Sequence, residues 1–421
     1  MPFRIALSGL NAASADLRVI GNNVANASTT GFKKSRVEFA DIYADSSGSN
    51  AIGAGVKVSS VKQEFAQGNI DFTNNNLDMA ISGEGFFRLN EGGEVKYSRA
   101  GSFGVDRSGF VVNSENQRLT GYVADATGTI TGALGDIQIS TNDLNPNATT
   151  NIDLTANLDS SQSVPTISPF NPLDASTYNN ATSLSTFDSL GNSLLQTLYF
   201  EKTANSGEWN MYTYVTTPQG TNLPVTPLGQ AAGSPTVLQF DPNGGLTSVV
   251  PDNGVSGTIA GFDPLSLTAS TGAADLNATI NMGNVTQYGS EFAVNGLVQD
   301  GYTTGRLSGI DVGDTGVVTA RYTNGQSLTL AQVAMANFSN LNGLLQLGDT
   351  TWAETFDSGS ALVGTPGTGT LGGIQSGALE GSNVDLTEQL VNMITAQRNF
   401  QANAQVIETA DTVTQTIINI R

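Results

Sequence analysis

The chain of 421 residues contains no cysteine and no histidine. Without cysteine it forms no disulfide framework and offers no thiolate as a nucleophile or metal ligand. Without histidine it lacks the commonest general base and the commonest metal ligand of proteins. Serine–histidine–aspartate triads, cysteine–histidine pairs and histidine-based zinc sites are therefore all excluded.

Basic residues and long apolar runs are also scarce. There are 17 Lys and Arg against 37 Asp and Glu, and Lys202 is the only basic residue between Arg118 and Arg306. Such a chain has little with which to neutralise phosphates, so we expect no nucleic-acid partner. No stretch approaches the ~20 apolar residues of a membrane span, so we expect no membrane insertion. Polar residues also interrupt the first 20 residues, unlike a cleaved secretory signal.

Glycine, in contrast, is plentiful, with 48 residues. Stretches such as 77–89 and 97–113 alternate apolar and polar residues between Gly, Asn and Asp, which is typical of short strands and turns. The pattern continues through a Thr-rich segment, 146–285, and resumes its earlier, more charged character after about residue 290. The middle of the chain is therefore predicted to be β-rich.

Both ends of the chain have helical periodicity instead. Residues 3–24 place apolar side chains at a and d positions over three heptads, with Ala6 and Ala13 allowing close approach. A second stripe follows Asp385, which with Glu388 resembles a capping box. The residues predicted to form assembly contacts are Phe3, Leu7, Leu10, Leu17, Ile20 and Val24 in the first helix, and Leu386, Leu390, Met393, Phe400, Ile407 and Ile417 in the second.

One chain alone covers these helices incompletely. Full burial of the apolar seam of residues 3–24 contributes at most about 10–15 kcal/mol, whereas ordering that segment costs on the order of 20–40 kcal/mol in backbone entropy. We therefore expect the terminal helices to be frayed in a single subunit and to order when neighbouring subunits cover them.

A polar stretch follows the first helix. Gly21 and the two Asn after it are expected to end that helix. The stretch is predicted to join the helical stalk to the β-rich body, at a place where the chain turns and can flex. The residues assigned to this joint are Asn22, Asn23, Asn26, Thr30, Gly31 and Phe32.

The predicted fold is mainly β, with terminal α-helices that form a coiled-coil-like stalk. It is a multi-domain arrangement in which two β-rich domains are nested in sequence. The predicted limits are an assembly helix at 1–26, a connecting segment at 27–70, an inner β domain at 71–145 and 286–357, an outer β domain at 146–285, a Gly-rich linker at 358–384 and a second assembly helix at 385–421.

These segments resemble a known family. "ALSGLNAASADLRVIGNNVANASTTGFKKSRVEFADIY" (6–43) and "LEGSNVDLTEQLVNMITAQRNFQANAQVIETADTVTQTIINIR" (379–421) are similar to the N- and C-terminal signatures of bacterial flagellar rod and hook proteins. "LDMAISGEGFFRL" (77–89), "YSRAGSFGVDRSGFVVN" (97–113) and residues 316–355 resemble the body of that axial family. "STFDSLGNSLLQTLYFEK" (185–202) is similar to the outer domain of its hook members, and the large insertion 146–285 also fits a hook subunit.

The resemblance implies a structural subunit and not an enzyme. Hook subunits polymerise into a short, curved, hollow helical tube that joins the motor's rod to the filament and transmits torque while bent. The implied partners are other copies of the chain, the rod protein, the hook cap, the hook–filament junction protein and the flagellar export apparatus. The implied location is the extracellular flagellum, reached by type III export without a cleaved signal, and no cofactor or metal is implied. Some hooks are cross-linked through a cysteine, which this chain lacks.

Three alternatives stay open at this point. A distal rod protein shares both ends but lacks so large an insertion, and a secreted adhesin would leave the paired apolar stripes unexplained. An enzyme could use Asp136 and Asp143, although solvated turn carboxylates are the simpler interpretation among 37 acidic residues. The "DVGD" stretch at 311–314 lacks a full Ca²⁺ loop. The GxGxxG spacing at 367–372 lacks the strand before it and the helix directly after it that a dinucleotide site needs.

Overall fold

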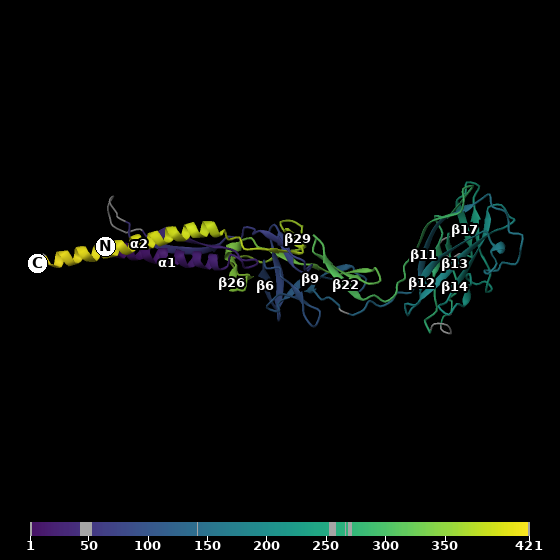
Figure 1. The fold of residues 1–421 in the computed structure, drawn as a ribbon, viewed down its shortest axis with the longest axis horizontal. Coiled ribbons are helices and arrows are strands. Elements are labelled where there is room, and N and C mark those ends of the chain that lie inside the picture. The colour runs from purple at the N-terminus through teal and green to yellow at the C-terminus, as the bar shows by residue number, and fades with distance from the viewer. Residues whose placement is uncertain are drawn as a thin grey trace. The chain divides into compact units, whose positions relative to one another are not determined.

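The computed structural model describes residues 2–42, 53–140, 142–251, 258–265, 267 and 272–419. The chain divides into two units, which Figure 1 colours by residue number. The first unit contains residues 1–141, 308–321 and 327–421, and the second contains 142–307 and 322–326.

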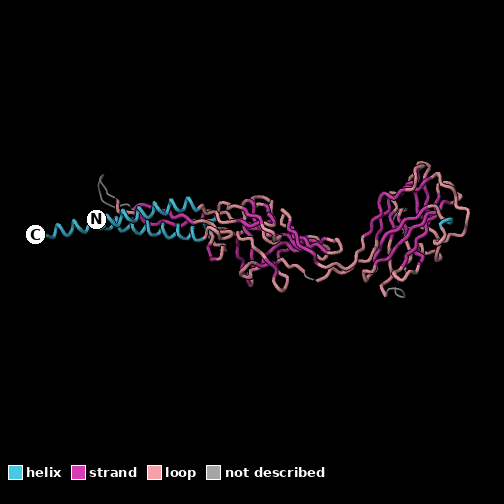
Figure 2. Tube along the Cα trace, viewed as in Figure 1, coloured by secondary structure: helices cyan, strands magenta, loops and turns pink. Residues whose placement is uncertain are grey.

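The first unit begins and ends with a helix. α1 spans Pro2–Ala25 and α2 spans Leu386–Asn419, and Figure 2 shows both in cyan, side by side. Asp385 accepts hydrogen bonds from the backbone N–H groups of Thr387 and Glu388 at 2.8 and 3.1 Å. This is the N-cap that the sequence predicts for α2. Within the described ranges, neither helix is long and apolar enough to cross a membrane.

The two helices run antiparallel. Near the end of α1, Asn23 Nδ2 donates to Gln389 Oε1 in the first turns of α2, at 3.1 Å. Nearer the start of α1, Gly9 lies directly against the side chain of Asn403. Both helices are thus formed and paired within one chain, so the expectation that a single subunit leaves them frayed is wrong for this structure.

α1 ends within one residue of the predicted limit at 26, but it passes through the residues that were expected to end it. Gly21, Asn22 and Asn23 lie inside the helix, which ends at Ala25. The side chain of Asn26 folds back and donates to the backbone carbonyl of Asn22 at 3.0 Å, so it helps to close the last turn. Local polarity suggested a stop at Gly21, but the helix is extended by the contacts that Asn23 makes beyond it.

A two-stranded hairpin follows α1 within the predicted connecting segment. β1 (Ser35–Asp41) and β2 (Val56–Gln63) pair antiparallel with a bulge at Glu38 and Phe39, and both strands contact α1. The segment therefore adds a β layer beside the helices.

The remaining strands of the first unit form its β body. They are β3 (Ile70–Phe72), β4 (Met79–Ser82), β5 (Phe86–Glu91), β6 (Glu94–Ser98), β7 (Gly104–Val105), β8 (Val111–Val112), β9 (Arg118–Ala124), β10 (Ile130–Asp136), β22 (Leu307–Val312), β23 (Val317–Tyr322), β24 (Ser327–Val333), β25 (Met335–Asn337), β26 (Leu345–Gly348), β27 (Thr351–Ala353), β28 (Leu362–Gly364), β29 (Gly373–Ser376) and β30 (Ala378–Glu380). Phe65, Phe86 and Trp352 pack edge to face in its aromatic core, with ring centroids 5.6–5.7 Å apart.

The Gly-rich segment predicted as a linker, 358–384, is part of this body. β28, β29 and β30 all come from it and pair antiparallel with β25, β4 and β3. Gly372 lies so close to the backbone of Ser82 that a Cβ would not fit. The small residues of segment 358–384 therefore allow strands to approach closely and also form turns. The prediction that this segment is a linker is wrong.

Among the described residues, four hairpin and loop turns share the pattern Asp-x-x-Gly, at 106–109, 125–128, 188–191 and 241–244. In each turn, Oδ1 of the Asp accepts hydrogen bonds of 2.8–2.9 Å from the N–H groups two and four residues later. The Gly has a φ of 82–85°, a conformation that favours glycine. Four of the acidic residues therefore stabilise turns by accepting backbone hydrogen bonds.

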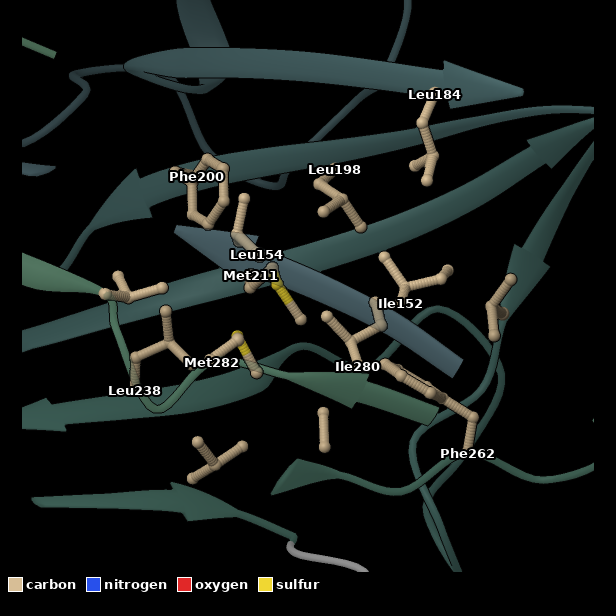
Figure 3. Packing of buried hydrophobic residues seen from close by; sticks show 14 of the residues in the cluster. Ile152, Leu154, Leu184, Leu198, Phe200, Met211, Leu238, Phe262, Ile280 and Met282 are labelled. Atoms are coloured by element: carbon tan, nitrogen blue, oxygen red, sulfur yellow. The ribbon is translucent and has the colours of Figure 1, made fainter. Parts of the chain in front are cut away.

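The second unit packs two sheets face to face. One contains β11 (Asn151–Asp159), β18 (Ile259–Ala260), β19 (Thr279–Asn281), β20 (Thr286–Tyr288) and β21 (Ala293–Gln299); the other contains β12 (Asn180–Phe187), β13 (Ser193–Lys202), β14 (Glu208–Thr216), β15 (Asn222–Val225), β16 (Thr236–Phe240) and β17 (Leu246–Val250). Residues from both sheets share one core, including Leu154, Leu198, Met211 and Ile280 (Figure 3). Because β20 and β21 pair with β11, the second unit extends to Leu307, beyond the predicted limit at 285.

Candidate assembly interface

One face of α1 is covered within the chain and the other is not. Ala6, Ala13 and Ile20 are buried, as are their neighbours Ala12 and Asn23. The alternate seam positions are less covered: Leu10, Leu17 and Val24 are half-buried, and Leu7 is exposed. Phe3 leaves 51% of its surface in solvent. The predicted assembly residues of α1 therefore divide between an intrachain contact and an open apolar face.

The apolar positions of α2 divide in the same way. The stripe that turns toward α1 is spaced alternately by four and three residues, as in a heptad seam. It consists of Gln389, Met393, Ala396, Phe400, Asn403, Ile407 and Ala410, which are buried or half-buried. Leu386 and Leu390, which the sequence placed on the same stripe, instead lie exposed with Val391 and Ile394. The side chain of Ile417 lies outside the described residues.

The prediction missed this seam because it considered apolar residues only, whereas Gln389 and Asn403 are polar. Asn403 lies against Gly9, and Gln389 is hydrogen-bonded to Asn23. The seam can be found in the sequence if polar residues are also allowed at the heptad positions of α2, and if the small Gly9 of α1 is paired with Asn403.

An open apolar groove lies near the free end of the helix pair. It has a volume of about 800 Å³ and is lined mainly by Phe3, Ala402, Val406, Ala410 and Val413. α2 continues beyond the part that α1 covers, and its last described apolar side chains, including Val413 and Ile418, are exposed. Apolar surface of this extent on paired helices is typical of a contact with further chains.

At the other end, buried ion pairs join the segment that follows α1 to β30, the last strand before α2. Lys33 Nζ lies 2.6 Å from Glu380 Oε1, and Arg99 lies 3.1 Å from Glu380 Oε2. The side chains of Lys33 and Glu380 are fully buried. Burial lowers the pKa of the Lys33 ammonium, and the adjacent Glu380 carboxylate partly opposes that effect. Two cations and one anion from distant parts of the chain thus meet at one point.

Hydrogen bonds surround this ion cluster. Asn23 donates to the Ser35 carbonyl at 2.8 Å and accepts from the Ser35 N–H at 2.9 Å. Asn383 accepts from the Lys34 N–H at 2.7 Å and donates to the Glu64 carbonyl at 2.7 Å. The joint is therefore held by buried polar contacts, in contrast to the flexible connection that its polar sequence suggested.

The residues assigned to the joint take two kinds of position. Asn23, Gly31 and Phe32 are buried, and the Gly31 N–H donates to the Glu380 carbonyl at 2.8 Å. Asn22 is exposed, and Asn26 and Thr30 are half-buried. The sequence did not single out Lys33, Arg99 and Glu380, because no local pattern shows that three charges so far apart in the chain meet.

The catalytic candidates Asp136 and Asp143 each have a basic partner, and so does Asp311 of the stretch considered for Ca²⁺. Asp136 pairs with Arg118 at 3.1 Å and accepts from Asn90, Asp143 lies 3.8 Å from Arg306, and Asp311 pairs with Arg321 at 2.8 Å. In the part of the chain that the structure describes, no three acidic side chains gather as a metal site would require.

The GxGxxG spacing forms a turn between β28 and β29. The Gly367 N–H donates to the Gly372 carbonyl at 3.0 Å, and a strand follows. The helix N-terminus that would bind a pyrophosphate does not follow this motif.

Comparisons with known families match most of the chain. Residues 3–33 match the model "Flagella basal body rod protein", and residues 375–420 match "Flagellar basal body rod FlgEFG protein C-terminal". Residues 80–157 match "Flagellar hook protein FlgE/F/G D1 domain", and residues 157–302 match "Flagellar basal body protein FlaE D2 domain". The full chain is 40% identical to the flagellar hook protein FlgE of Escherichia coli (strain K12), over 100% of both chains. The chain belongs to the flagellar hook protein family.

Other hook proteins agree with this assignment. The hook protein FlgE of Salmonella typhimurium is 40% identical over 100% of both chains, and that of Borreliella burgdorferi is 32% identical over 99% of this chain and 98% of its own. The crystal structure of Helicobacter pylori flagellar hook protein FlgE2 has a TM-score of 0.53 at 12% identity, covering 74% of this chain and 100% of its own. That likeness supports the hook-protein fold.

Proposed function

We propose that this hook protein polymerises through α1 and α2 into the hollow, curved tube that joins the rotary motor's rod to the flagellar filament. The observation that carries the proposal is the open apolar face on both paired helices. Phe3, Leu390 and Val406 are exposed on structured helices, although each is a large apolar side chain. In a helical polymer, neighbouring stalks cover such faces and stabilise one another.

Torque transmission is the mechanical role that follows. The buried cluster of Lys33, Arg99 and Glu380 connects the stalk to the β body, so that a load on one reaches the other through ion pairs and hydrogen bonds. Bending of the tube would then take place by sliding between subunits. The acidic surface, with a net charge of −20, suits weak and reversible contacts between the outer parts of neighbours.

The family also supports further partners and a route of export as parts of this proposal. The tube would begin on the rod protein, grow beneath the hook cap and end at the hook–filament junction protein. Subunits would pass through the flagellar type III export apparatus without a cleaved signal peptide and reside in the extracellular hook. These partners follow from membership of the family, since a hook needs a neighbour at each end.

Negative-stain electron microscopy of the purified chain in a polymerising salt tests the proposal. We expect tubes from the full chain and none from a truncated chain that lacks residues 1–24 and 386–421. Val406→Asp should abolish tubes because it places a charge in the apolar groove, whereas Gln401→Asp, on an exposed position of the same helix, should leave them intact. Single particles from the full chain, or tubes from the truncated chain, would reject assembly through the helices.

The sequence left two other non-enzymatic functions open, a distal rod protein and a secreted adhesin. The full-length relatives are named hook proteins, and the match to the FlaE D2 domain model covers the central insertion from residue 157 onward. Both observations favour the hook subunit.

A further inference from the structure

One glycine of α1 lies directly against a side chain of α2. A Cβ built on Gly9 would lie 2.8 Å from Cγ and 2.9 Å from Nδ2 of Asn403, which is too close for atoms that are not bonded. The other glycine of the helix, Gly21, meets no described atom within 4 Å. The carboxamide of Asn403 therefore occupies the space that a side chain at position 9 would need. We call this space the Gly9 hole.

Asn403 fills the Gly9 hole by its shape and not by a hydrogen bond. Its Nδ2 donates to the Asn399 carbonyl at 2.8 Å, one turn earlier in its own helix. Among the described residues, no hydrogen bond joins its carboxamide to α1. A polar residue in a helix seam lowers stability but selects one register over others. The position of Asn403 is typical of such a residue.

A second polar layer lies near the other end of the seam. Asn23 Nδ2 donates to Gln389 Oε1 at 3.1 Å. This layer is fourteen residues from Gly9 along α1 and fourteen from Asn403 along α2, which is two heptads on each helix. Equal spacing on two antiparallel helices means that both contacts belong to one register. They are about 21 Å apart along the helix axis, at about 1.5 Å per residue.

The apolar residues of the seam do not select this register by themselves. The small side chains of α1, Ala6 and Ala13, are seven residues apart, and so are the large side chains of α2, which are Met393, Phe400 and Ile407. A shift of one heptad therefore places small residues opposite large ones once more. The Gly9 hole is not repeated on the covered face of α1, because Gly21 lies away from it. Such a shift would leave the Asn403 side chain without a hole to enter.

The register also determines the shape of the apolar groove at the free end of the helices. Val406 follows Asn403 by three residues and lines that groove. Phe3 precedes Gly9 by six residues and Thr409 follows Asn403 by six, so the two are level with each other, and both line the groove. A shift of one heptad would move Phe3 by about 10 Å along α2. The groove would then lose its present lining.

We propose that Gly9 and Asn403 are positioning residues for assembly. The Asn403 side chain, seated in the Gly9 hole, fixes the register of α2 on α1 at the free end and so gives the groove its shape. The ion cluster and the Asn23 layer fix the register only at the other end, about 21 Å away. The inference rests on the proposed function, because the register affects assembly through the groove.

Pulsed electron paramagnetic resonance can measure the register in unassembled full chains, because the chain has no native cysteine. Spin labels on Arg4→Cys and Gln401→Cys, both at exposed positions, report the distance between the two helices near their free ends. We expect one narrow distance distribution in the labelled parent. Gly9→Ala and Asn403→Ala should each broaden it about twofold, because the free ends then sample more than one arrangement. An unchanged distribution in both variants would overturn the proposed role.

A second substitution can rescue Gly9→Ala. Asn403→Ser shortens the side chain that meets the new methyl group, so the double variant Gly9→Ala/Asn403→Ser nearly conserves the volume of the layer. Its distance distribution should be narrow again. Asn399→Ala is the matched control for Asn403→Ala, because it makes the same change at an exposed position one turn earlier, and it should leave the distribution narrow. A double variant as broad as Gly9→Ala alone would contradict a fit between the two residues.

Assembly of the unlabelled variants into tubes tests the link between register and function. Gly9→Ala and Asn403→Ala should each raise the chain concentration needed for tubes about tenfold, because a groove that is no longer preorganised binds its neighbour more weakly. The double variant should assemble like the parent, and circular dichroism should show the same helix content in all of them. Unchanged assembly in a variant with a broad distance distribution would overturn the link to the groove.

Two further outcomes are distinguishable. A helix content that falls together with assembly would reduce Gly9 and Asn403 to a purely structural role and overturn their role in positioning. Failure of the parent chain to form tubes would remove the proposed function, whereas the distance measurement on unassembled chains would still decide whether the two residues fix the register.

Discussion

Removal of the charge on Glu380 should strongly destabilise the first unit. Glu380→Gln leaves Lys33 and Arg99 buried without a counter-charge, and a broken buried ion pair costs about 3–5 kcal/mol. The same carboxylate accepts the Gly68 N–H at 2.9 Å, a bond that the Gln side chain can keep through its carbonyl oxygen. The Gln side chain keeps the shape of Glu, but its NH₂ group cannot accept from Arg99 Nη1, which lies 3.1 Å from the other carboxylate oxygen. The variant therefore loses the charge and one hydrogen bond, and we expect the unfolding free energy to fall by about 3–5 kcal/mol.

Intrinsic fluorescence can isolate this loss, because the two tryptophans lie in different units. Trp352 is buried in the first unit and Trp209 in the second. In a Trp209→Phe background, urea unfolding followed by fluorescence reports the first unit alone. Trp209→Phe removes no hydrogen bond, since Trp209 Nε1 has no partner among the described residues.

Glu388→Gln is the control for Glu380→Gln. Glu388 pairs with Lys34 at 3.3 Å, but its side chain is half exposed, so its removal should cost less than about 1 kcal/mol. Adding Lys33→Met to Glu380→Gln should recover part of the loss by removing one uncompensated cation. If Glu380→Gln costs no more than Glu388→Gln, the buried cluster does not stabilise the joint, and load is not transferred through it.

Three further perturbations test other contacts. Gly21→Ala should stabilise α1 by about 0.5–1 kcal/mol, because a Cβ there meets no atom. Gly9→Ala should not show this gain, because its Cβ would collide with the side chain of Asn403. Thermal melting followed by circular dichroism measures both variants, and equal effects would contradict the packing of Gly9 against Asn403. Thr350→Gly should stabilise the β26–β27 turn by about 1 kcal/mol, because Thr350 has a φ of 53°, which is strained for a residue with a Cβ. A lower unfolding free energy in urea would mean that the contacts of the Thr350 hydroxyl outweigh this backbone strain. Burial alone would raise the pKa of Asp300, but hydrogen bonds from Thr150 and Asn151 outweigh it and hold the pKa below its ordinary value. Its contribution is therefore present above the ordinary carboxyl pKa and is lost as the pH falls through the lower folded value, so acid unfolding of the second unit, followed by Trp209 fluorescence, should be less steep in Asp300→Asn.

The sequence predicted those features that depend on local spacing. The heptad positions Ala6, Ala13 and Ile20 are buried, and Asp385 caps α2, because helix periodicity and capping act over a few residues. The Asp-x-x-Gly turns could have been found in the same way, since their hydrogen bonds span only four residues.

Features that depend on distant partners were missed. Residues 358–384 read as a linker because Gly, Ser and Thr are typical of loops, yet β30 pairs with β3, which lies more than 300 residues earlier. Exposed and buried charges also look alike in a sequence, so Lys33 and Glu380 could not be told from solvated residues. The division of the α2 stripe into a covered and an open face depended on where α1 lies, which periodicity alone does not specify.

The pairing of Lys33 with Glu380 has a consequence for the order in which the chain folds. The two residues are separated by 347 positions, so the first unit can close only after nearly the whole polypeptide has become available. The second unit is almost continuous in sequence, from 142 to 307, and needs no residue from α1 or α2. As synthesis proceeds from the N-terminus, we expect the second unit to gain structure first. The assembly surfaces would then mature last, which keeps unfinished chains from polymerising.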